Sequence, residues 1–187
     1  MRARLIAVGG VTALMLAGCN AEPPAAALPP VQVVEPPAAS AGGACVLWDY
    51  AFIEDRTGVR FTVAAGGHVD DTSTCVVQTE TGAAPSLVLT VVDRTSADAA
   101  LFTADLMPEK ATRVKGLGRA GYRLVRPAAE GAGPSIEVGW LSEAQQLQSL
   151  KFTFAEGAPA DAVTDMTGRL VEMAKTMDTT DGEAAAK

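Results

Sequence analysis

The chain has 187 residues, with 22 acidic residues, 15 basic residues and a single histidine, and its formal net charge is −7. Because nucleic acids attract basic surfaces, an acidic chain without an arginine-rich helix does not match a nucleic-acid-binding protein. The length is enough for one globular domain with one hydrophobic core.

The N-terminus has the organisation of an export signal. Arg2 and Arg4 give it a positive start, and the uncharged apolar stretch Leu5–Leu16 is too short for a permanent membrane-spanning helix. The next residues, Leu16-Ala17-Gly18-Cys19, resemble the lipobox of bacterial lipoproteins, in which the cysteine accepts a diacylglyceryl group. We therefore expect residues 1–18 to be a lipoprotein signal peptide. Lipidated Cys19 would then hold the protein at the extracytoplasmic face of the cell membrane. The alternative is an ordinary secretory signal that ends at a chance cysteine.

The next segment predicts a spacer. Residues 20–44 contain six of the eleven prolines, as three Pro-Pro pairs among alanines and valines. Such a composition favours extended conformations and would reach roughly 75 Å at ~3 Å per residue. Recognition by a proline-binding partner is the alternative. We assign residues 19–44 to the lipidated cysteine and linker, residues 45–177 to one globular domain, and the small polar residues 178–187 to a disordered tail.

Cleavage before Cys19 leaves thirteen basic and 22 acidic residues, a net charge of −9. It also leaves Cys45 and Cys75, and an exported cysteine pair predicts a disulfide. A bridge of that span contributes about 3–4 kcal/mol in the chain-entropy model. Two cysteines and one histidine cannot provide four zinc ligands, and we predict no metal site and no cofactor.

The first predicted element of the domain is a short helix over about Tyr50–Thr57. Asp49 is a suitable N-cap for it, and Trp48 and Ile53 have the spacing of a hydrophobic staple. Gly58 provides a left-handed end.

Two strands and a second helix are expected next. The strands are Cys75–Glu80 and Ser86–Arg94, joined by a turn over residues 81–84. Alternating leucines and valine give the second strand one apolar face. A helix would then run from a Ser96 cap to about Met107.

Extended segments and a long helix complete the pattern. The stretch Val114–Arg126 begins with a glycine-rich turn and becomes extended near Tyr122. Alternation predicts two half-buried strands around Ile136, Val138 and Trp140 and around Leu150, Phe152 and Phe154. The last helix begins near Pro159 and Asp161 and has an apolar stripe of Val163, Met166, Leu170, Met173 and Met177. The sequence therefore predicts a single α+β domain, in which helices cover one face of an antiparallel sheet.

A family resemblance follows from these features together. The chain combines the lipobox and Pro/Ala linker with Ala44-Cys45-x-Leu47, Cys75 and Val114-x-Gly116-Leu117-Gly118-x-Ala120. This pattern resembles a broad group of actinobacterial lipoproteins of unknown function with a cysteine-paired α+β domain. The resemblance covers residues 16–175 and implies a fold class and a location, but no catalytic residues. Phe52 stands where a capping-box acid is usual.

Candidate catalytic chemistry is sparse. His68 lies in Gly66-Gly67-His68-Val69-Asp70-Asp71, where a metal site with the aspartates or a general base is one interpretation. We favour a turn before Cys75, because adjacent aspartates point apart in an extended chain and the sequence has no Gly-x-Ser-x-Gly elbow. The Gly116-x-Gly118 pair lacks the third glycine and the lysine of a phosphate loop, and we interpret it as a tight turn. We predict no catalytic residue.

One basic segment stands out. Six of the thirteen mature basic residues lie within seventeen positions, without an acid between Glu109 and Glu130. They are Lys110, Arg113, Lys115, Arg119, Arg123 and Arg126. We expect a local positive surface for an anionic ligand or an acidic partner, with glycine N–H groups of the segment near the anion. The alternative is a solvated loop.

The main functional hypothesis is a membrane-anchored lipoprotein without enzymatic activity. It would bind an envelope protein or an anionic small ligand through the basic segment. A cell-envelope hydrolase with unidentified carboxylate catalysts is the second hypothesis. A sensor or accessory subunit of a membrane complex is the third.

Overall fold

The computed structural model describes residues 36–129 and 131–185, with side chains up to Asp178. The predicted signal peptide, Cys19 and the linker up to Glu35 lie outside the described residues. Within the described part, no helix is long and apolar enough to cross a membrane.

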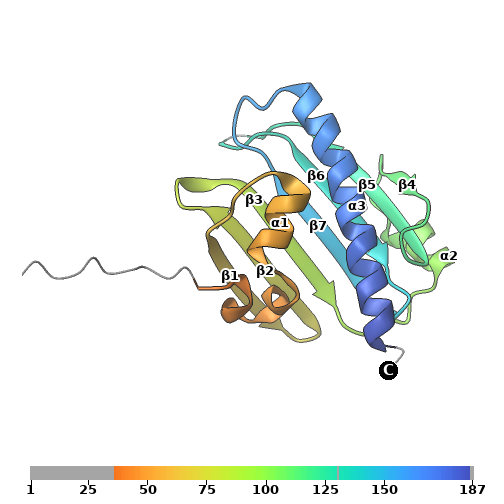
Figure 1. Ribbon diagram of the computed structural model, residues 1–187. Coiled ribbons are helices and arrows are strands. Elements are labelled where there is room, and N and C mark those ends of the chain that lie inside the picture. Colours follow the sequence, from red (N-terminus) through yellow and green to blue (C-terminus); the bar gives the residue numbers. More distant parts are fainter. Residues whose placement is uncertain (1–35, 130, 186–187) are drawn as a thin grey trace, which may run out of the picture. The chain divides into compact units, whose positions relative to one another are not determined.

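A seven-stranded antiparallel sheet forms the centre of the domain, with the strand order β1-β2-β3-β7-β6-β5-β4 (Figure 1). Its strands are β1 Val63–Val69, β2 Thr72–Thr79, β3 Gly82–Val92, β4 Thr112–Val114, β5 Ala120–Arg126, β6 Ser135–Leu141 and β7 Leu147–Thr153. Strands β1 to β3 form one meander and β4 to β7 a second, and β3 pairs with β7 where the two meet. With helices α1 (Tyr50–Thr57), α2 (Ala99–Leu101) and α3 (Ala160–Ala185), this confirms the predicted α+β fold.

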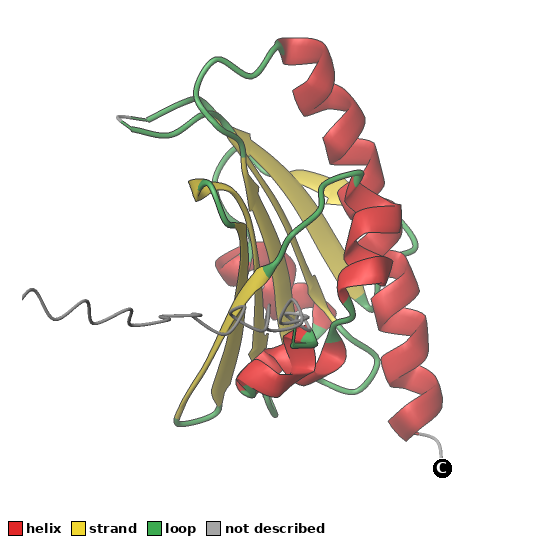
Figure 2. Cartoon of the chain, turned by 60° about the vertical axis from the view of Figure 1, so that its left-hand side comes forward, coloured by secondary structure: helices red, strands yellow, loops and turns green. Residues whose placement is uncertain are grey.

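Helices α1 and α3 lie over the same side of the sheet (Figure 1), and Figure 2 shows the long helix α3 along that side. Because side chains alternate along a strand, Leu89, Leu150 and Val138 share this face in neighbouring strands. They form one core cluster with the predicted apolar stripe of α3. All five stripe residues are buried, which confirms the stripe: Val163, Met166, Leu170, Met173 and Met177.

The opposite face of the sheet is covered at one end by a short segment. Helix α2 continues into the π-helix η3 (Phe102–Leu106), and Phe102 packs with Tyr122, Leu124 and Leu141 in a second cluster. The two longer helices thus share one face of the sheet, whereas α2 and η3 lie on the other.

The N-terminal part of the domain is fixed by caps and by the disulfide. The Asp49 side chain accepts a hydrogen bond of 2.8 Å from the Ala51 N–H, and Gly58 ends α1 in the left-handed conformation, as predicted. The Cys45–Cys75 disulfide is also confirmed, with a Cα–Cα distance of 4.8 Å and both residues fully buried. It joins the 3-10 helix η2 (Gly43–Leu47) to β2; η2 follows the 3-10 helix η1 (Ala38–Ala41).

Several local predictions differ from the structure. Strand β1 was not predicted, and His68 lies in it, whereas the turn is at Asp70 and Asp71. The turn between β2 and β3 is at Glu80 and Thr81, so that β3 begins earlier, at Gly82.

The second helix begins later and is shorter than predicted. Asp98 rather than Ser96 is its N-cap, because the Asp98 carboxylate accepts from the N–H groups of Ala100 and Leu101. At the C-terminus, α3 continues beyond Met177, where the domain was predicted to end, and the side chains after Asp178 lie outside the described residues.

Candidate functional site

The structure does not bring the six predicted basic residues to one surface. Arg113 and Arg123 face opposite sides of the sheet, since Arg113 pairs with Tyr122, the neighbour of Arg123. A first groove is lined by Arg113, Lys115 and Arg119. A second groove, on the other face, is lined by Lys110 and Arg123. The sixth residue, Arg126, forms an ion pair.

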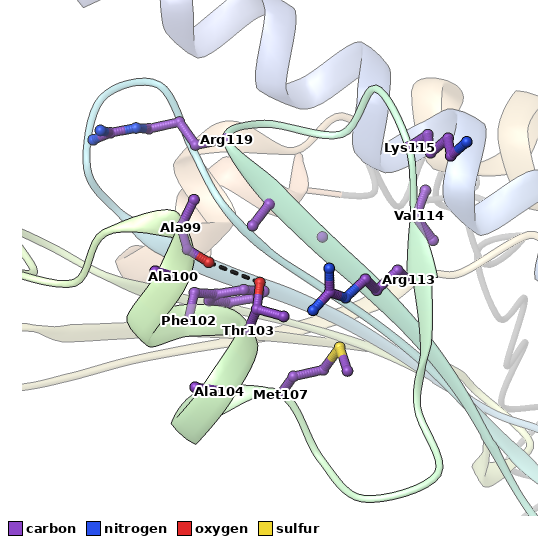
Figure 3. Close-up of a pocket in the computed structure, with 12 residues that line it drawn as sticks. Ala99, Ala100, Phe102, Thr103, Ala104, Met107, Arg113, Val114, Lys115 and Arg119 are labelled. Carbon is purple, nitrogen blue, oxygen red and sulfur yellow. Dashed lines mark hydrogen bonds between the residues drawn. The ribbon is translucent and has the colours of Figure 1, made fainter.

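The first groove lies between the α2–η3 segment and strands β4 and β5, and has a volume of ≈ 740 Å³. Small side chains form the α2–η3 side, and Phe102 and Met107 add apolar surface. In Figure 3 the Arg113 side chain extends toward η3, whereas Lys115 and Arg119 extend away from the middle of the groove. Its lining residues are Ala99, Ala100, Phe102, Thr103, Ala104, Met107, Arg113, Val114, Lys115, Arg119, Ala120 and Gly121.

The charges at this groove are largely uncompensated. Within the described part of the chain, neither Arg113 nor Lys115 forms an ion pair, and no acidic side chain lines the groove. Arg119 lies beside the side-chain amide of Gln145, whose oxygen accepts from its guanidinium when the amide is turned toward it. Arg113 is therefore the cation best placed to meet a ligand over apolar surface.

The wall of the groove has an unusual backbone. The Met107 N–H donates to the Phe102 carbonyl over 2.8 Å, which is the i to i+5 bond of a π-helix. Such single turns are rare and are frequent at functional sites. The Thr103 hydroxyl donates to the Ala99 carbonyl at 2.7 Å, so that this side chain lies back along the helix. The two bonds fix the face that Phe102 and Met107 present to Arg113.

A buried tyrosine of strand β5, Tyr122, packs against Phe102. The rings of Phe102 and Tyr122 stack with centroids 5.9 Å apart, and the Tyr122 ring lies over Gly139, where a Cβ atom would be 2.6 Å from it. The Tyr122 hydroxyl donates to Glu137 Oε1 at 2.6 Å, and Arg126 donates to Glu137 Oε2 at 3.1 Å. Burial, and then the hydrogen bond and charge of Glu137, raise the pKa of Tyr122 well above its usual value.

The glycine turn of the basic segment is occupied by the chain itself. The Gly118 N–H donates to Asp178 Oδ2 of α3 at 3.1 Å. Gly118 has a φ of +51°, and a Cβ atom there would meet the Leu141 carbonyl. The expectation that this N–H contacts an external anion is therefore wrong, since a carboxylate of the same chain already accepts from it.

His68 lies at β1, the sheet edge opposite to β4. Its Nδ1 is 2.8 Å from the Ser73 hydroxyl oxygen, on an exposed surface. Among the described residues no carboxylate hydrogen-bonds to this imidazole, and no three His, Cys, Asp or Glu side chains are grouped closely enough to hold a metal ion. The structure thus gives no specific observation in favour of the hydrolase hypothesis.

The sequence interpretation missed Phe102, Glu137 and Gly139 as parts of this site. Gly139, a residue without a side chain inside an alternating strand, was the one signal that another group approaches closely there. Comparisons with protein-family models, with curated proteins and with solved structures gave no match to this chain.

Proposed function

We propose that the protein is a lipid-anchored binding module at the extracytoplasmic face of the cell membrane, and that its first groove binds an anionic ligand with an apolar body. The observation that carries the binding proposal is Arg113, an exposed guanidinium without an ionic partner in the described residues, directed across an apolar groove toward η3.

The chemistry of the groove selects this ligand class. A guanidinium presents N–H donors in a planar fork that matches a carboxylate or a phosphate. Phe102, Met107 and the alanines of α2 and η3 have no polar side-chain group to offer, so they favour an alkyl chain or a ring next to the anionic group. Lys115 and Arg119 at the ends of the groove add long-range attraction for an anion.

The location rests on residues 1–19, which lie outside the described residues. Their charged start, short apolar stretch and lipobox-like end support export and lipidation of Cys19, and the resemblance to actinobacterial lipoproteins agrees with it. In cells, the Cys19→Ala variant should leave the membrane fraction or accumulate as an uncleaved precursor. Retention of a correctly cleaved Cys19→Ala chain in the membrane would refute the anchor.

Binding is tested by calorimetric titration of the purified full chain with dodecyl phosphate below its micellar concentration. Arg113→Gln should weaken binding about tenfold or more, because a hydrogen bond to a charged group contributes about 1.5–3 kcal/mol. Lys151→Gln is the matched control, since Lys151 is exposed on β7 and lines neither groove.

Two further probes separate the parts of the ligand. Dodecyltrimethylammonium lacks the negative charge, and inorganic phosphate lacks the apolar body. Both should bind much more weakly than dodecyl phosphate. Added salt should weaken binding, because exposed charges are screened over about 8 Å at physiological ionic strength. Equal binding by wild type and Arg113→Gln would refute this function for the groove.

A further inference from the structure

A second groove lies between strands β4 and β5 and the first turns of α3, on the sheet face opposite to the first groove, and has a volume of ≈ 400 Å³. Among the described residues, Lys110 and Arg123 are the only charged residues that line it, and neither forms an ion pair there. Its lining residues are Lys110, Thr112, Arg123, Val125, Val163, Thr164 and Thr167.

We propose that this second groove binds a polyol phosphate, with the phosphate between Lys110 and Arg123 and a ligand hydroxyl on α3. The first reason is the position of Arg123. It continues the row of Leu89, Leu150 and Val138, which is buried under the helices, but Arg123 itself is exposed. At this end of the row, a cation of the sheet therefore borders an open space beside α3.

The backbone at Lys110 is the second reason. Lys110 has a φ of +67° in a tight turn that the Ala111 N–H closes onto the Pro108 carbonyl at 3.1 Å. Glycine or asparagine is usual at this turn position, because a larger side chain is strained there. A residue held in a strained conformation is often a functional one. Here the side chain so placed is the second cation of the groove.

The threonines define the rest of the ligand. The Thr164 hydroxyl donates to the Ala160 carbonyl at 3.0 Å, and the Thr167 hydroxyl to the Val163 carbonyl at 2.7 Å. Their hydrogens are used in these bonds, so their oxygens offer only acceptor positions to a ligand. Thr164 is exposed and Thr167 is buried, so Thr164 is the accessible acceptor.

A ligand on Thr164 must therefore carry a hydrogen-bond donor, a role that we assign to a hydroxyl, as well as the phosphate for the two cations. The Thr112 hydroxyl, which makes no hydrogen bond in the described residues, remains free to donate to a phosphate oxygen. A free polyol or sugar phosphate and the polyol-phosphate headgroup of a lipid share this chemistry.

The test is titration of the purified full chain with glycerol 3-phosphate at low salt, with glycerol and inorganic phosphate as reference probes. Wild type should prefer glycerol 3-phosphate to both. Arg123→Gln should lose about tenfold or more in affinity for it, whereas Lys151→Gln should bind as wild type does. Thr164→Val should lower the preference for glycerol 3-phosphate over inorganic phosphate about fivefold, an effect that loss of a general positive potential would not produce.

Vesicles of phosphatidylglycerol, compared with vesicles of phosphatidylcholine, separate the two sources. If vesicles of phosphatidylglycerol compete with glycerol 3-phosphate and vesicles of phosphatidylcholine do not, the result supports a lipid headgroup as the ligand. Binding of glycerol 3-phosphate without such competition supports a soluble polyol phosphate. No binding of glycerol 3-phosphate by wild type, unchanged binding by Arg123→Gln, or an unchanged preference in Thr164→Val would each overturn the proposal. Circular dichroism of each variant checks that it is folded.

Discussion

Replacing Tyr122 by phenylalanine removes one hydroxyl from the support of the first groove and leaves the ring in place. Tyr122 is buried, with 7% of the residue's surface exposed, and its hydroxyl donates to Glu137 Oε1 at 2.6 Å. The stack on Phe102 and the contact with Gly139 depend on the ring alone. The variant therefore isolates the hydrogen bond between a hydroxyl and a carboxylate.

The structure sets the size of the expected effect. A hydrogen bond to a charged group contributes about 1.5–3 kcal/mol to stability. After the substitution, Glu137 keeps only Arg126 among the described side chains, and because the Arg126 side chain is 49% exposed, this ion pair contributes little. The Glu137 side chain is itself 19% exposed, and water can replace part of the lost bond. We expect Tyr122→Phe to lower the free energy of unfolding by about 2 kcal/mol.

The assay is urea unfolding at neutral pH, followed by the fluorescence of Trp48 and Trp140, which are both buried in the native state. The midpoint should fall while the dependence on urea stays the same. The melting temperature should fall by about 4–8 °C. A difference below ~0.5 kcal/mol, the usual size for a surface substitution, would refute the account of the Tyr122–Glu137 bond.

The same pair predicts how the difference changes with pH. The pKa of Tyr122 is raised in the folded state, first by burial and then by Glu137, so that the unfolded chain loses this proton at a lower pH than the folded chain does. The contribution of Tyr122 is therefore complete below its unfolded pKa of about 10 and declines as the pH rises further. The stability difference between wild type and Tyr122→Phe should be constant near neutral pH and should narrow above about pH 10. A difference that widens in alkaline solution would contradict this sign.

Two further predictions concern the two halves of the sheet. The double variant Cys45→Ala and Cys75→Ala removes a bridge that spans 30 residues and should lower the free energy of unfolding by about 3.6 kcal/mol in the chain-entropy model, measured by urea unfolding without reductant. An unchanged midpoint, or two reactive thiols at these positions in the unreduced wild type, would contradict it. Gly139→Ala places a methyl group against the Tyr122 ring and should cost about 1–3 kcal/mol. Its matched control, Gly168→Ala in α3, meets no atom within 4 Å and should stabilise the helix by up to about 1 kcal/mol; equal effects of the two substitutions would refute the packing argument.

The elements that were predicted correctly are those in which local signals and tertiary contacts agree. Asp49 and Gly58 mark the ends of α1 by capping chemistry that needs only neighbouring residues. The stripe of α3 and the alternation around Val138 and Phe152 reflect burial against a single core, and that burial imposes a regular period on the sequence.

Strand β1 was missed because its pattern is set by a neighbour distant in sequence. Its middle residues are alanines and glycines, which have low strand propensity. Gly43 of η2 would place a Cβ atom 2.6 Å from the Gly67 carbonyl oxygen, and a Cβ atom on Gly66 would meet the Gly42 carbonyl. Small residues in this strand therefore permit the close approach of η2, and nothing within the strand indicates that.

The candidate site could be predicted only in part. The cluster of basic residues is visible in the sequence, but its division between two faces depends on the register in which Thr112 pairs with Arg123. The wall opposite Arg113 comes from α2 and η3, where Asp98 starts the helix two residues later than a Ser96 cap would. Asp178 is about sixty residues from Gly118 in the chain, and no local rule brings a carboxylate to that N–H.

If the domain is anchored through its N-terminal segment, as proposed, the position of the disulfide has a mechanical consequence. Tension that enters through η1 and η2 passes from Cys45 directly to Cys75 in the interior of β2, which is paired with a strand on each side. Helix α1 and strand β1 lie inside the closed loop and carry none of this tension. Reduction would send the same tension through α1 into β1, an edge strand with one neighbour, which can peel away from the sheet one pair at a time. The redox state of the Cys45–Cys75 disulfide therefore determines whether tension on the N-terminal segment acts on the middle of a paired strand or on the free edge of the sheet.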